Sequence, residues 1–205
     1  MNDILKKNID IAFEGSTNKT EFLNGINNYV AKLSLLNNNQ DNTNIKLFLT
    51  DVDGVLTDAG MYYSENGDEL KKFNTRDGKA FELLRNAGIK TGIITSEKTK
   101  IVEARAKKLK VDYLFQGALY KLPIIKEICD KENISISDVA YIGDDLNDEL
   151  ALRNVGFAFC PQDARIKIKN IHNIKILKTN GGDGVVREAV DFLLNTIKRD
   201  INQEE

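Results

Sequence analysis

The sequence predicts an α/β fold in which helices cover both faces of a largely parallel β-sheet. From residue 45 onward, short apolar runs that suit strands alternate with amphipathic runs that suit helices. Parallel strands need such crossover connections, because the chain must return to the same end of the sheet before each new strand. The length of 205 residues also leaves room for one domain of about 150 residues and an appendage.

The expected elements follow one another in a regular order. An apolar strand at 45–51 ends in carboxylates, and a helix at about 78–87 ends at Gly88. Further strands are apolar runs at 90–95, 111–115, 138–143, 156–160 and 174–177. Further helices, each with apolar residues on one side, are expected at about 98–109, 121–132, 146–153 and 184–197. This order predicts a Rossmann-like, three-layer domain without an internal repeat.

The first 44 residues have a different character. Two helix-like stretches, at 3–13 and 20–36, precede a polar stretch at 37–44 that has little to bury. We expect residues 1–44 to be a helical N-terminal extension with a polar linker, and residues 45–200 to be the α/β domain. The extension could help the protein oligomerise, bind a partner, or take no part in catalysis, and its sequence does not distinguish these alternatives.

A β-hairpin is expected between the first strand and the first helix of the domain. Two short extended runs, within 60–63 and 69–73, flank an Asn66-Gly67 turn. The hairpin is either a surface ribbon or a cover for a site or an interface. An isolated hairpin is marginally stable, which favours packing against something.

Composition excludes several function classes. A net charge of −2 provides no field for holding nucleic acid or an anionic membrane, and no stretch approaches the roughly 20 apolar residues of a membrane span. We expect a cytoplasmic protein. Cys129 and Cys160 lie in apolar surroundings and suit inert buried thiols, and the single His172 lies in a polar stretch that suits the surface. Any acid–base chemistry therefore falls to carboxylates.

The chemistry is expected at the carboxyl ends of the strands. In a parallel sheet these ends meet along one edge, where open α/β sheets bind ligands. Asp51 and Asp53, one residue apart, would share a face just past the first strand. Four strand ends supply, in chain order, Asp51-Val52-Asp53-Gly54, Thr95-Ser96, Lys121 and Gly143-Asp144-Asp145-Leu146-Asn147-Asp148.

This inventory suits phosphoryl transfer. Mg²⁺ prefers hard oxygen ligands and usually takes one or two carboxylates, which Asp51 and Asp144 would supply. Lys121 and the donors near Thr95 would neutralise the phosphoryl oxygens while Asp51 attacks phosphorus. Asp53 would protonate the leaving alcohol and later deprotonate the hydrolytic water. Asp145 and Asp148 are expected to support the site.

These motifs resemble those of the haloacid dehalogenase superfamily of phosphatases. Within it, the chain resembles the subfamily acting on phosphorylated 2-keto-3-deoxy sugar acids, over about residues 45–195. The resemblance rests on residues 51–58, 95, 121 and 143–148, and on the segments 73–78, 116–117 and 181–188. It implies an aspartyl-phosphate at Asp51, and Mg²⁺ held by Asp51, Asp144 and the backbone carbonyl of Asp53.

The spacing of the motifs leaves no room for a cap domain. Only the hairpin separates Asp58 from Thr95, and one helix and one strand fill the space to Lys121. Relatives of this capless type close their sites by forming a homotetramer, so the resemblance implies one here. It also implies a role in lipopolysaccharide or sialic acid biosynthesis.

The expected substrate is a 3-deoxy-manno-octulosonate 8-phosphate or a nonulosonate 9-phosphate. Arg76-Asp77-Gly78 resembles the octulosonate enzymes, whereas Ser96-Glu97 is closer to the Gly-Glu of the nonulosonate enzymes than to Gly-Arg. The residues expected to bind substrate are Asp53, Asn74, Thr75, Arg76, Asp77, Gly78, Glu97, Arg105, Lys108 and Lys121.

Some of these residues are expected to act across subunits. At 1.5 Å per residue, Glu97 and Lys108 lie roughly 16 Å apart along one helix, too far for one sugar. Arg105 and Lys108 are therefore expected to reach a neighbouring subunit's site, the alternative being a solvated basic helix face. Arg187, in the glycine-rich stretch 181–187, either binds an anion over the substrate or only enters the last helix.

Two other function classes compete with a phosphatase. A non-catalytic oligomerisation domain, like that attached to acylneuraminate cytidylyltransferases, need not keep Asp51, Asp53, Lys121 and Asp144. A phosphate-accepting receiver domain also uses acids, a hydroxyl and a lysine. It would not be expected to place its acids as Asp-x-Asp on the first strand and Gly-Asp-Asp-x-x-Asp late in the chain.

Overall fold

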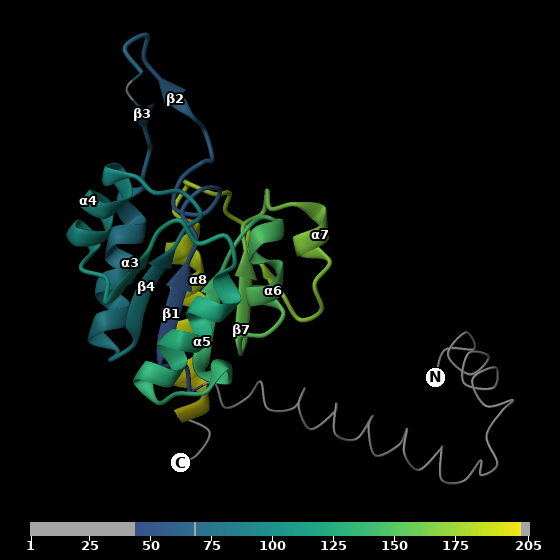
Figure 1. Ribbon diagram of the computed structural model, residues 1–205. Coiled ribbons are helices and arrows are strands. Elements are labelled where there is room, and N and C mark those ends of the chain that lie inside the picture. Colours follow the sequence, from purple (N-terminus) through teal and green to yellow (C-terminus); the bar gives the residue numbers. More distant parts are fainter. Residues whose placement is uncertain (1–43, 68, 202–205) are drawn as a thin grey trace, which may run out of the picture. The chain divides into compact units, whose positions relative to one another are not determined.

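A six-stranded parallel sheet forms the centre of the domain, as the sequence predicts. The structure is a computed structural model that describes residues 44–67 and 69–201. The strands lie in the order β5-β4-β1-β6-β7-β8, of which Figure 1 labels β4, β1 and β7. Their bounds are β1 Leu47–Thr50, β4 Lys90–Ile94, β5 Tyr113–Phe115, β6 Val139–Ile142, β7 Phe157–Cys160 and β8 Lys175–Ile176.

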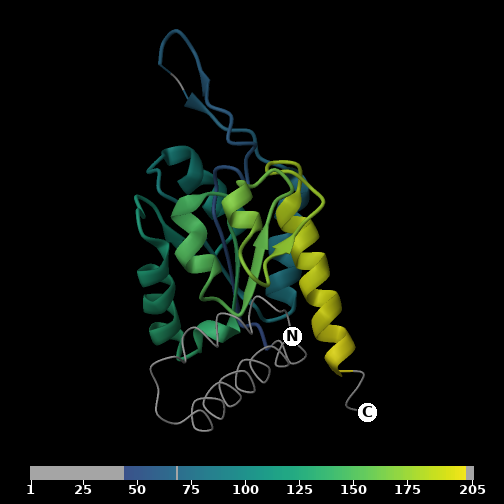
Figure 2. The same cartoon turned by 90° about the vertical axis from the view of Figure 1, so that its right-hand side faces the viewer.

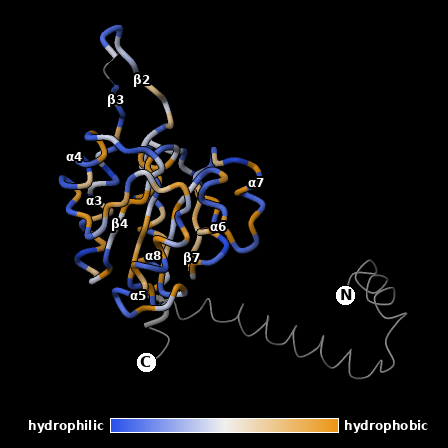
Figure 3. Tube along the Cα trace, viewed as in Figure 1, coloured by the Kyte–Doolittle hydropathy of each residue, from blue (hydrophilic) through white to orange (hydrophobic). Residues whose placement is uncertain are grey.

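Helices cover both faces of this sheet, which gives three layers. The bounds are α3 Thr75–Asn86, α4 Lys100–Leu109, α5 Lys121–Glu132, α6 Glu149–Leu152, α7 Ile166–Lys169 and α8 Val185–Ile201, with 3₁₀ turns η2 at Ile136–Asp138 and η3 at Leu146–Asp148. Side chains of β1 alternate between the faces: Phe48 packs with α3, α4 and α8, whereas Leu47 and Leu49 pack with α5, α6 and α7. Figures 2 and 3 show the layers and the apolar strands between them.

Several predicted helix bounds differ from the structure for local reasons. Helix α3 begins at Thr75, earlier than predicted, because the Asn74 side chain accepts a hydrogen bond from the amide of Arg76 and caps the helix. The predicted helix 146–153 is divided into η3 and α6, since Asp145 caps a 3₁₀ turn first. The short helix α7 was not predicted.

The predicted hairpin is present at the carboxyl edge of the sheet. Strands β2 (Tyr62–Tyr63) and β3 (Glu69–Leu70) pair antiparallel, and the hairpin extends away from the three layers (Figure 1). Its large apolar side chains Met61, Tyr62, Tyr63 and Leu70 are exposed. No cap domain interrupts the described part of the chain, so only this hairpin stands beside the site.

The helices predicted at 3–13 and 20–36 lie outside the described residues. Within residues 44–67 and 69–201, no helix combines the length and the apolar character that crossing a membrane requires.

Candidate active site

Asp51 follows directly after β1, in the middle of the sheet. The strand register places Thr50 beside Ile93 of β4 and Ile142 of β6, so the residues that follow these strands meet at one edge. The Asp51 side chain is buried, and its Oδ1 accepts a hydrogen bond of 2.7 Å from the amide of Val52. Asp51 is thus held at the position predicted for the nucleophile.

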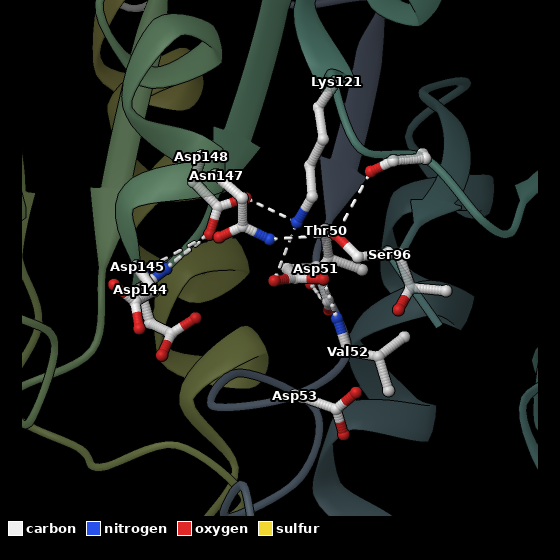
Figure 4. A network of polar contacts seen from close by, with 12 residues as sticks. Thr50, Asp51, Val52, Asp53, Ser96, Lys121, Asp144, Asp145, Asn147 and Asp148 are labelled. Atoms are coloured by element: carbon white, nitrogen blue, oxygen red, sulfur yellow. Dashed lines mark hydrogen bonds and ion pairs between the residues drawn. The ribbon is translucent and has the colours of Figure 1, made fainter. Parts of the chain in front are cut away.

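Lys121, the first residue of α5, neutralises Asp51 (Figure 4). Its Nζ lies 2.7 Å from Asp51 Oδ2 and 2.5 Å from Asp148 Oδ1, and the lysine side chain is fully buried. Burial alone would lower the pKa of Lys121, but the two carboxylates outweigh burial and hold the pKa above its ordinary value. A permanent positive charge therefore lies beside Asp51.

Asp148 holds the lysine. Its Oδ1 also accepts a hydrogen bond of 2.6 Å from the Tyr141 hydroxyl, and its Oδ2 accepts from the amides of Asp144 and Asp145 at 2.9 and 3.3 Å. Gly143 makes room for it, since a Cβ there would come within 2.4 Å of the Asp148 side chain. With four donors, this carboxylate has no free acceptor site, which fits a supporting role.

Asp144 adds a further carboxylate to the pocket. One oxygen from each of Asp51, Asp144 and Asp148 lies within 4.8 Å of the others. Burial, followed by the charges of Asp51 and Asp148, raises the pKa of Asp144 to about 8. Burial also raises the pKa of Asp51 to about 7, with Asp148 adding to the effect and Lys121 opposing it. The cluster has more negative charge than its one lysine compensates, and a cation would relieve it.

The donors of this cluster fit Mg²⁺, which prefers oxygen ligands and few carboxylates. Because Asp148 is fully used, the side chains that would hold the ion are Asp51 and Asp144. The backbone carbonyl of Asp53 is the third protein ligand that the family resemblance implies. Gly54 has a φ of +81°, and a Cβ there would lie 2.1 Å from Asp144 Oδ2. The glycine is therefore required for the close approach of the two segments.

A second ionic cluster lies at the outer part of the site. Asp53 Oδ1 accepts hydrogen bonds from Lys71 Nζ at 2.6 Å and from Thr57 Oγ1 at 3.2 Å. The same Nζ donates to Glu97 Oε2 at 2.8 Å. Burial would lower the pKa of Lys71, but hydrogen bonds and charges from Asp53 and Glu97 outweigh it and raise the pKa. Lys71 follows β3, so the hairpin contributes directly to the site.

Both clusters border one cleft. Its volume is about 260 Å³, and it is lined by Asp51, Asp53, Ala59, Thr95, Ser96, Glu97, Asp144, Asp145 and Asn147. Thr95 is buried at the end of β4, and Asn147 donates through Nδ2 to Ser96 Oγ at 3.1 Å. The structure thus brings together the predicted residues from three strand ends around a space of the size of a small ligand.

Other predicted substrate-binding residues do not line this cleft. Apart from Lys121, which contacts Asp51, they are Asn74, Thr75, Arg76, Asp77 and Gly78, around the start of α3, and Arg105 and Lys108 on α4. Asp77 is fully buried, accepts a hydrogen bond of 3.0 Å from the Arg187 amide, and has its pKa raised to about 6, chiefly by burial. Within one subunit, Asp77 therefore joins α3 to α8.

Arg105 is also engaged within its own subunit. Its Nη2 donates to the Asn74 carbonyl at 2.7 Å, and its guanidinium lies 5.1 Å from the centre of the Phe73 ring. Lys108 is exposed near the end of α4. Action of Arg105 and Lys108 on a neighbouring subunit stays a prediction, and Arg105 would have to give up the Asn74 contact to make it.

The glycine-rich stretch 181–184 packs against the loop that follows Asp53. Gly182 donates its amide to the Val55 carbonyl at 2.9 Å, and a Cβ at Gly181 would lie 2.1 Å from the Gly54 carbonyl oxygen. Arg187 pairs with Asp191 one turn further along α8, at 2.8 Å. In this structure the stretch packs against residues 54–58, and Arg187 makes an intrahelical ion pair.

Sequence reasoning missed Lys71, Tyr141 and Asn147. The alternation Glu69-Leu70-Lys71 could have shown that both charges share one side of β3, but no spacing links them to Asp53. In the sequence, Tyr141 is indistinguishable from the apolar residues of its strand. Only the structure shows that its hydroxyl donates to Asp148, the last residue of η3.

Fold and site together are those of a hydrolase that acts on phosphate esters. A family model described as haloacid dehalogenase-like hydrolase matches residues 62–156. The 3-deoxy-D-manno-octulosonate 8-phosphate phosphatase of Escherichia coli strain K12 is 39% identical over 151 residues, covering 74% of this chain and 80% of the relative. Its counterpart in Haemophilus influenzae is 36% identical, with 74% and 83% covered. The chain belongs to the haloacid dehalogenase-like hydrolase family.

Solved structures agree with this assignment. The 3-deoxy-D-manno-octulosonate 8-phosphate phosphatase from Moraxella catarrhalis, in complex with magnesium, phosphate and KDO, is 34% identical with a TM-score of 0.74, covering 81% of this chain and 97% of that one. The Yersinia pestis enzyme of the same name is 36% identical with a TM-score of 0.73, covering 78% and 85%. The predicted fold class is confirmed.

Proposed function

We propose that this protein is a Mg²⁺-dependent phosphatase of a phosphorylated 2-keto-3-deoxy sugar acid, with 3-deoxy-D-manno-octulosonate 8-phosphate as the first candidate substrate. The observation that carries the proposal is the central cluster, in which Asp51 lies between a buried lysine and a second strand-end acid, Asp144. A non-catalytic domain would have no need of this cluster, and relatives named as phosphatases cover most of the chain.

The residues divide the reaction into two displacements. Asp51 attacks phosphorus, the bond from phosphorus to the leaving oxygen breaks, and Asp53 gives that oxygen a proton. Water then attacks the phosphoryl group on Asp51 and loses its proton to Asp53. Lys121, with Thr95 at the cleft wall, neutralises the phosphoryl oxygens. Bound Mg²⁺ would supply further neutralisation of this charge.

A nonulosonate 9-phosphate is the second candidate substrate. Glu97 lies at the cleft where the sequence differs from the Gly-Arg expected for octulosonate enzymes, and its side chain is 40% exposed. A carboxylate there suits sugar hydroxyls or an amide N–H. The choice between the two substrates corresponds to lipopolysaccharide or sialic acid biosynthesis, and both place the enzyme in the cytoplasm.

The proposal includes a homotetramer that closes the open cleft. The exposed hairpin side chains Met61, Tyr62, Tyr63 and Leu70 suit a subunit contact, because large apolar groups gathered on a protruding ribbon gain by burial. Arg105 and Lys108 would then serve a neighbouring site. Subunits carrying Lys108→Ala mixed with subunits carrying Asp51→Asn should regain activity, and mixtures without any gain would oppose shared sites.

Phosphate release tests the proposal directly. The substrates are 3-deoxy-D-manno-octulosonate 8-phosphate, keto-deoxynonulosonate 9-phosphate and N-acylneuraminate 9-phosphate, each with Mg²⁺ and with a chelator. We expect one substrate to be clearly preferred, and activity to be lost with the chelator and in Asp51→Asn. Absence of metal-dependent release from all three, with Asp51→Asn no worse than the parent, would contradict the proposed function.

A further inference from the structure

Lys71 occupies an unusual position for a hairpin lysine. Its side chain is 1% exposed, and its Nζ lies 2.6 Å from Asp53, 2.8 Å from Glu97 and 3.5 Å from Glu69. A surface ion pair contributes little because water screens it, whereas a shielded ammonium among three carboxylates is held in one geometry. Lys71 therefore restricts the orientation of the carboxylates that it contacts.

The contacts of Lys71 select one oxygen of Asp53. Both donors to this carboxyl group, Lys71 and Thr57, bond to Oδ1. Within the described residues, Oδ2 accepts no hydrogen bond, so it is the oxygen left to exchange a proton. A carboxyl group with two donors on one oxygen cannot rotate freely, and a general acid must present its proton within hydrogen-bond reach of the leaving oxygen.

Glu97 anchors the lysine to the sheet. Its amide donates to Thr95 Oγ1 at 3.4 Å, and its carbonyl accepts from the Gly117 amide at 3.2 Å. The segment carrying Glu97 is thus attached to the end of β4 and to the turn before α5. Through Glu97, a lysine that comes from the hairpin is held against the rigid part of the domain.

We infer that Lys71 is a positioning residue for the proton transfers of Asp53, and that Glu97 is its anchor. In the first displacement, a proton on Asp53 Oδ2 passes to the leaving oxygen as the bond to phosphorus breaks. In the second, the same oxygen takes a proton from the attacking water. This inference rests on the proposed function of Asp53, and it assigns to Glu97 a task beyond contact with the sugar.

Comparing two substrates that differ in leaving group tests whether Lys71 positions Asp53. A variant that only misfolds or binds phosphate poorly would slow both substrates equally. The leaving oxygen of an alkyl ester such as 3-deoxy-D-manno-octulosonate 8-phosphate needs a proton, whereas 4-nitrophenyl phosphate releases 4-nitrophenolate, which is stable without one. First-turnover release of the leaving group is measured for both substrates at saturating Mg²⁺. Lys71→Met should slow release from the alkyl ester by about 30- to 100-fold, and release of 4-nitrophenolate by less than about threefold.

Three further variants make the test specific. Lys71→Arg should recover most of the alkyl-ester rate, and Glu97→Gln should show the same substrate dependence at about three- to tenfold. Lys72→Met is the matched control, because that lysine is also on the hairpin, is 56% exposed, and pairs with Asp58 at 3.3 Å. It should leave both rates unchanged.

Asp53→Asn distinguishes failure of this inference from failure of the proposed function. If Asp53→Asn slows only the alkyl ester while Lys71→Met slows both substrates equally or neither, the inference about Lys71 is wrong and the role of Asp53 stands. If Asp53→Asn itself slows both substrates equally, the proposed role of Asp53 is wrong. Thermal melting and Mg²⁺ titration calorimetry establish that each variant is folded. Should Lys71→Met fail to fold, equal slowing of both substrates in Glu97→Gln would overturn the inference.

Discussion

Two lysines with shielded side chains each join one acid of the Asp-x-Asp motif to a further carboxylate. Lys121 links Asp51 to Asp148, and its side chain is 0% exposed. Lys71 links Asp53 to Glu97, and its side chain is 1% exposed. Lys121 begins a helix of the central domain, whereas Lys71 follows β3 of a hairpin that extends from it.

This difference separates two tasks. The Lys121 cluster is built from strand ends and a helix start, so the sheet itself fixes the charge next to Asp51. The Lys71 cluster depends on where the hairpin lies, so proton transfer at Asp53 is coupled to the hairpin. The proposed phosphoryl transfer thus depends on the sheet and α5, whereas the proposed proton transfer depends also on the hairpin.

Replacing Lys121 should have the largest effect. Lys121→Met leaves Asp51 and Asp148 buried without a partner charge, which typically costs about 3–5 kcal/mol of unfolding free energy. We expect kcat to fall by about 10³-fold or more for alkyl and aryl phosphates alike, because neutralisation of the phosphoryl group is lost. Urea unfolding and steady-state kinetics measure both effects. If Lys121→Met instead slowed alkyl esters more than aryl phosphates, Lys121 and Lys71 would not have the different roles proposed for them.

Gly54→Ala should weaken the metal site next. The new Cβ would lie 2.1 Å from Asp144 Oδ2 at a backbone φ of +81°. We expect Mg²⁺ affinity to fall by about 10- to 100-fold in titration calorimetry, the usual loss when a group that orients a metal ligand is disturbed. Gly67→Ala at the hairpin tip is the matched control, because its φ is +82° and nothing lies within 4 Å of its Cβ. Equal losses in both variants would mean that backbone strain alone is responsible.

The acids of the Lys121 cluster should make Mg²⁺ binding depend on pH. The raised pKa values, about 7 for Asp51 and about 8 for Asp144, mean that metal binding must displace protons at pH 6 but few at pH 8.5. Without metal, Asp51 and Asp144 bind more protons in the folded protein than in the unfolded chain. This difference holds at pH values between their ordinary pKa of 3.8 and their raised pKa values. Metal-free stability from these groups should therefore fall as pH rises.

Thermal melting measures this dependence. The rise in Tm caused by Mg²⁺ should grow between pH 6 and pH 8.5, and apparent affinity should increase by at least about tenfold. The Asp144→Asn variant should lose most of the dependence. A Tm increment that is the same at both pH values would contradict the raised pKa values.

Tyr141→Phe should have the smallest effect. It removes one hydrogen bond to Asp148 and leaves those from Lys121 and from the amides of Asp144 and Asp145 in place. We expect a loss of about 1.5–3 kcal/mol in unfolding free energy, the usual range for a hydrogen bond to a charged group, and only a few-fold change in kcat. Chemical unfolding and kinetics measure it, and a loss of activity as large as that of Lys121→Met would show that Tyr141 takes part in the chemistry.

Much of the central cluster could be predicted from the sequence, because periodicity determines where strands end and parallel strands align those ends. Asp51, Thr95 and Asp144 were placed at one edge on this basis, and the structure has them around one cleft. Lys71 could not be predicted, since the path of a hairpin over a site depends on packing between segments distant in the chain. The burial of Asp77 was missed for a similar reason: its partner, the Arg187 amide, is 110 residues away.

Trapping the phosphoryl group tests the central claim most directly. In Asp53→Asn, 4-nitrophenyl phosphate should still phosphorylate the enzyme with Mg²⁺, because 4-nitrophenolate leaves without a proton, while hydrolysis lacks its base. Acid quenching and peptide mass spectrometry should then find one phosphoryl group on Asp51, and none after chelation or in Asp51→Asn. A phosphoryl group on another residue, or turnover by Asp53→Asn with no phosphorylated peptide at any time, would contradict the account.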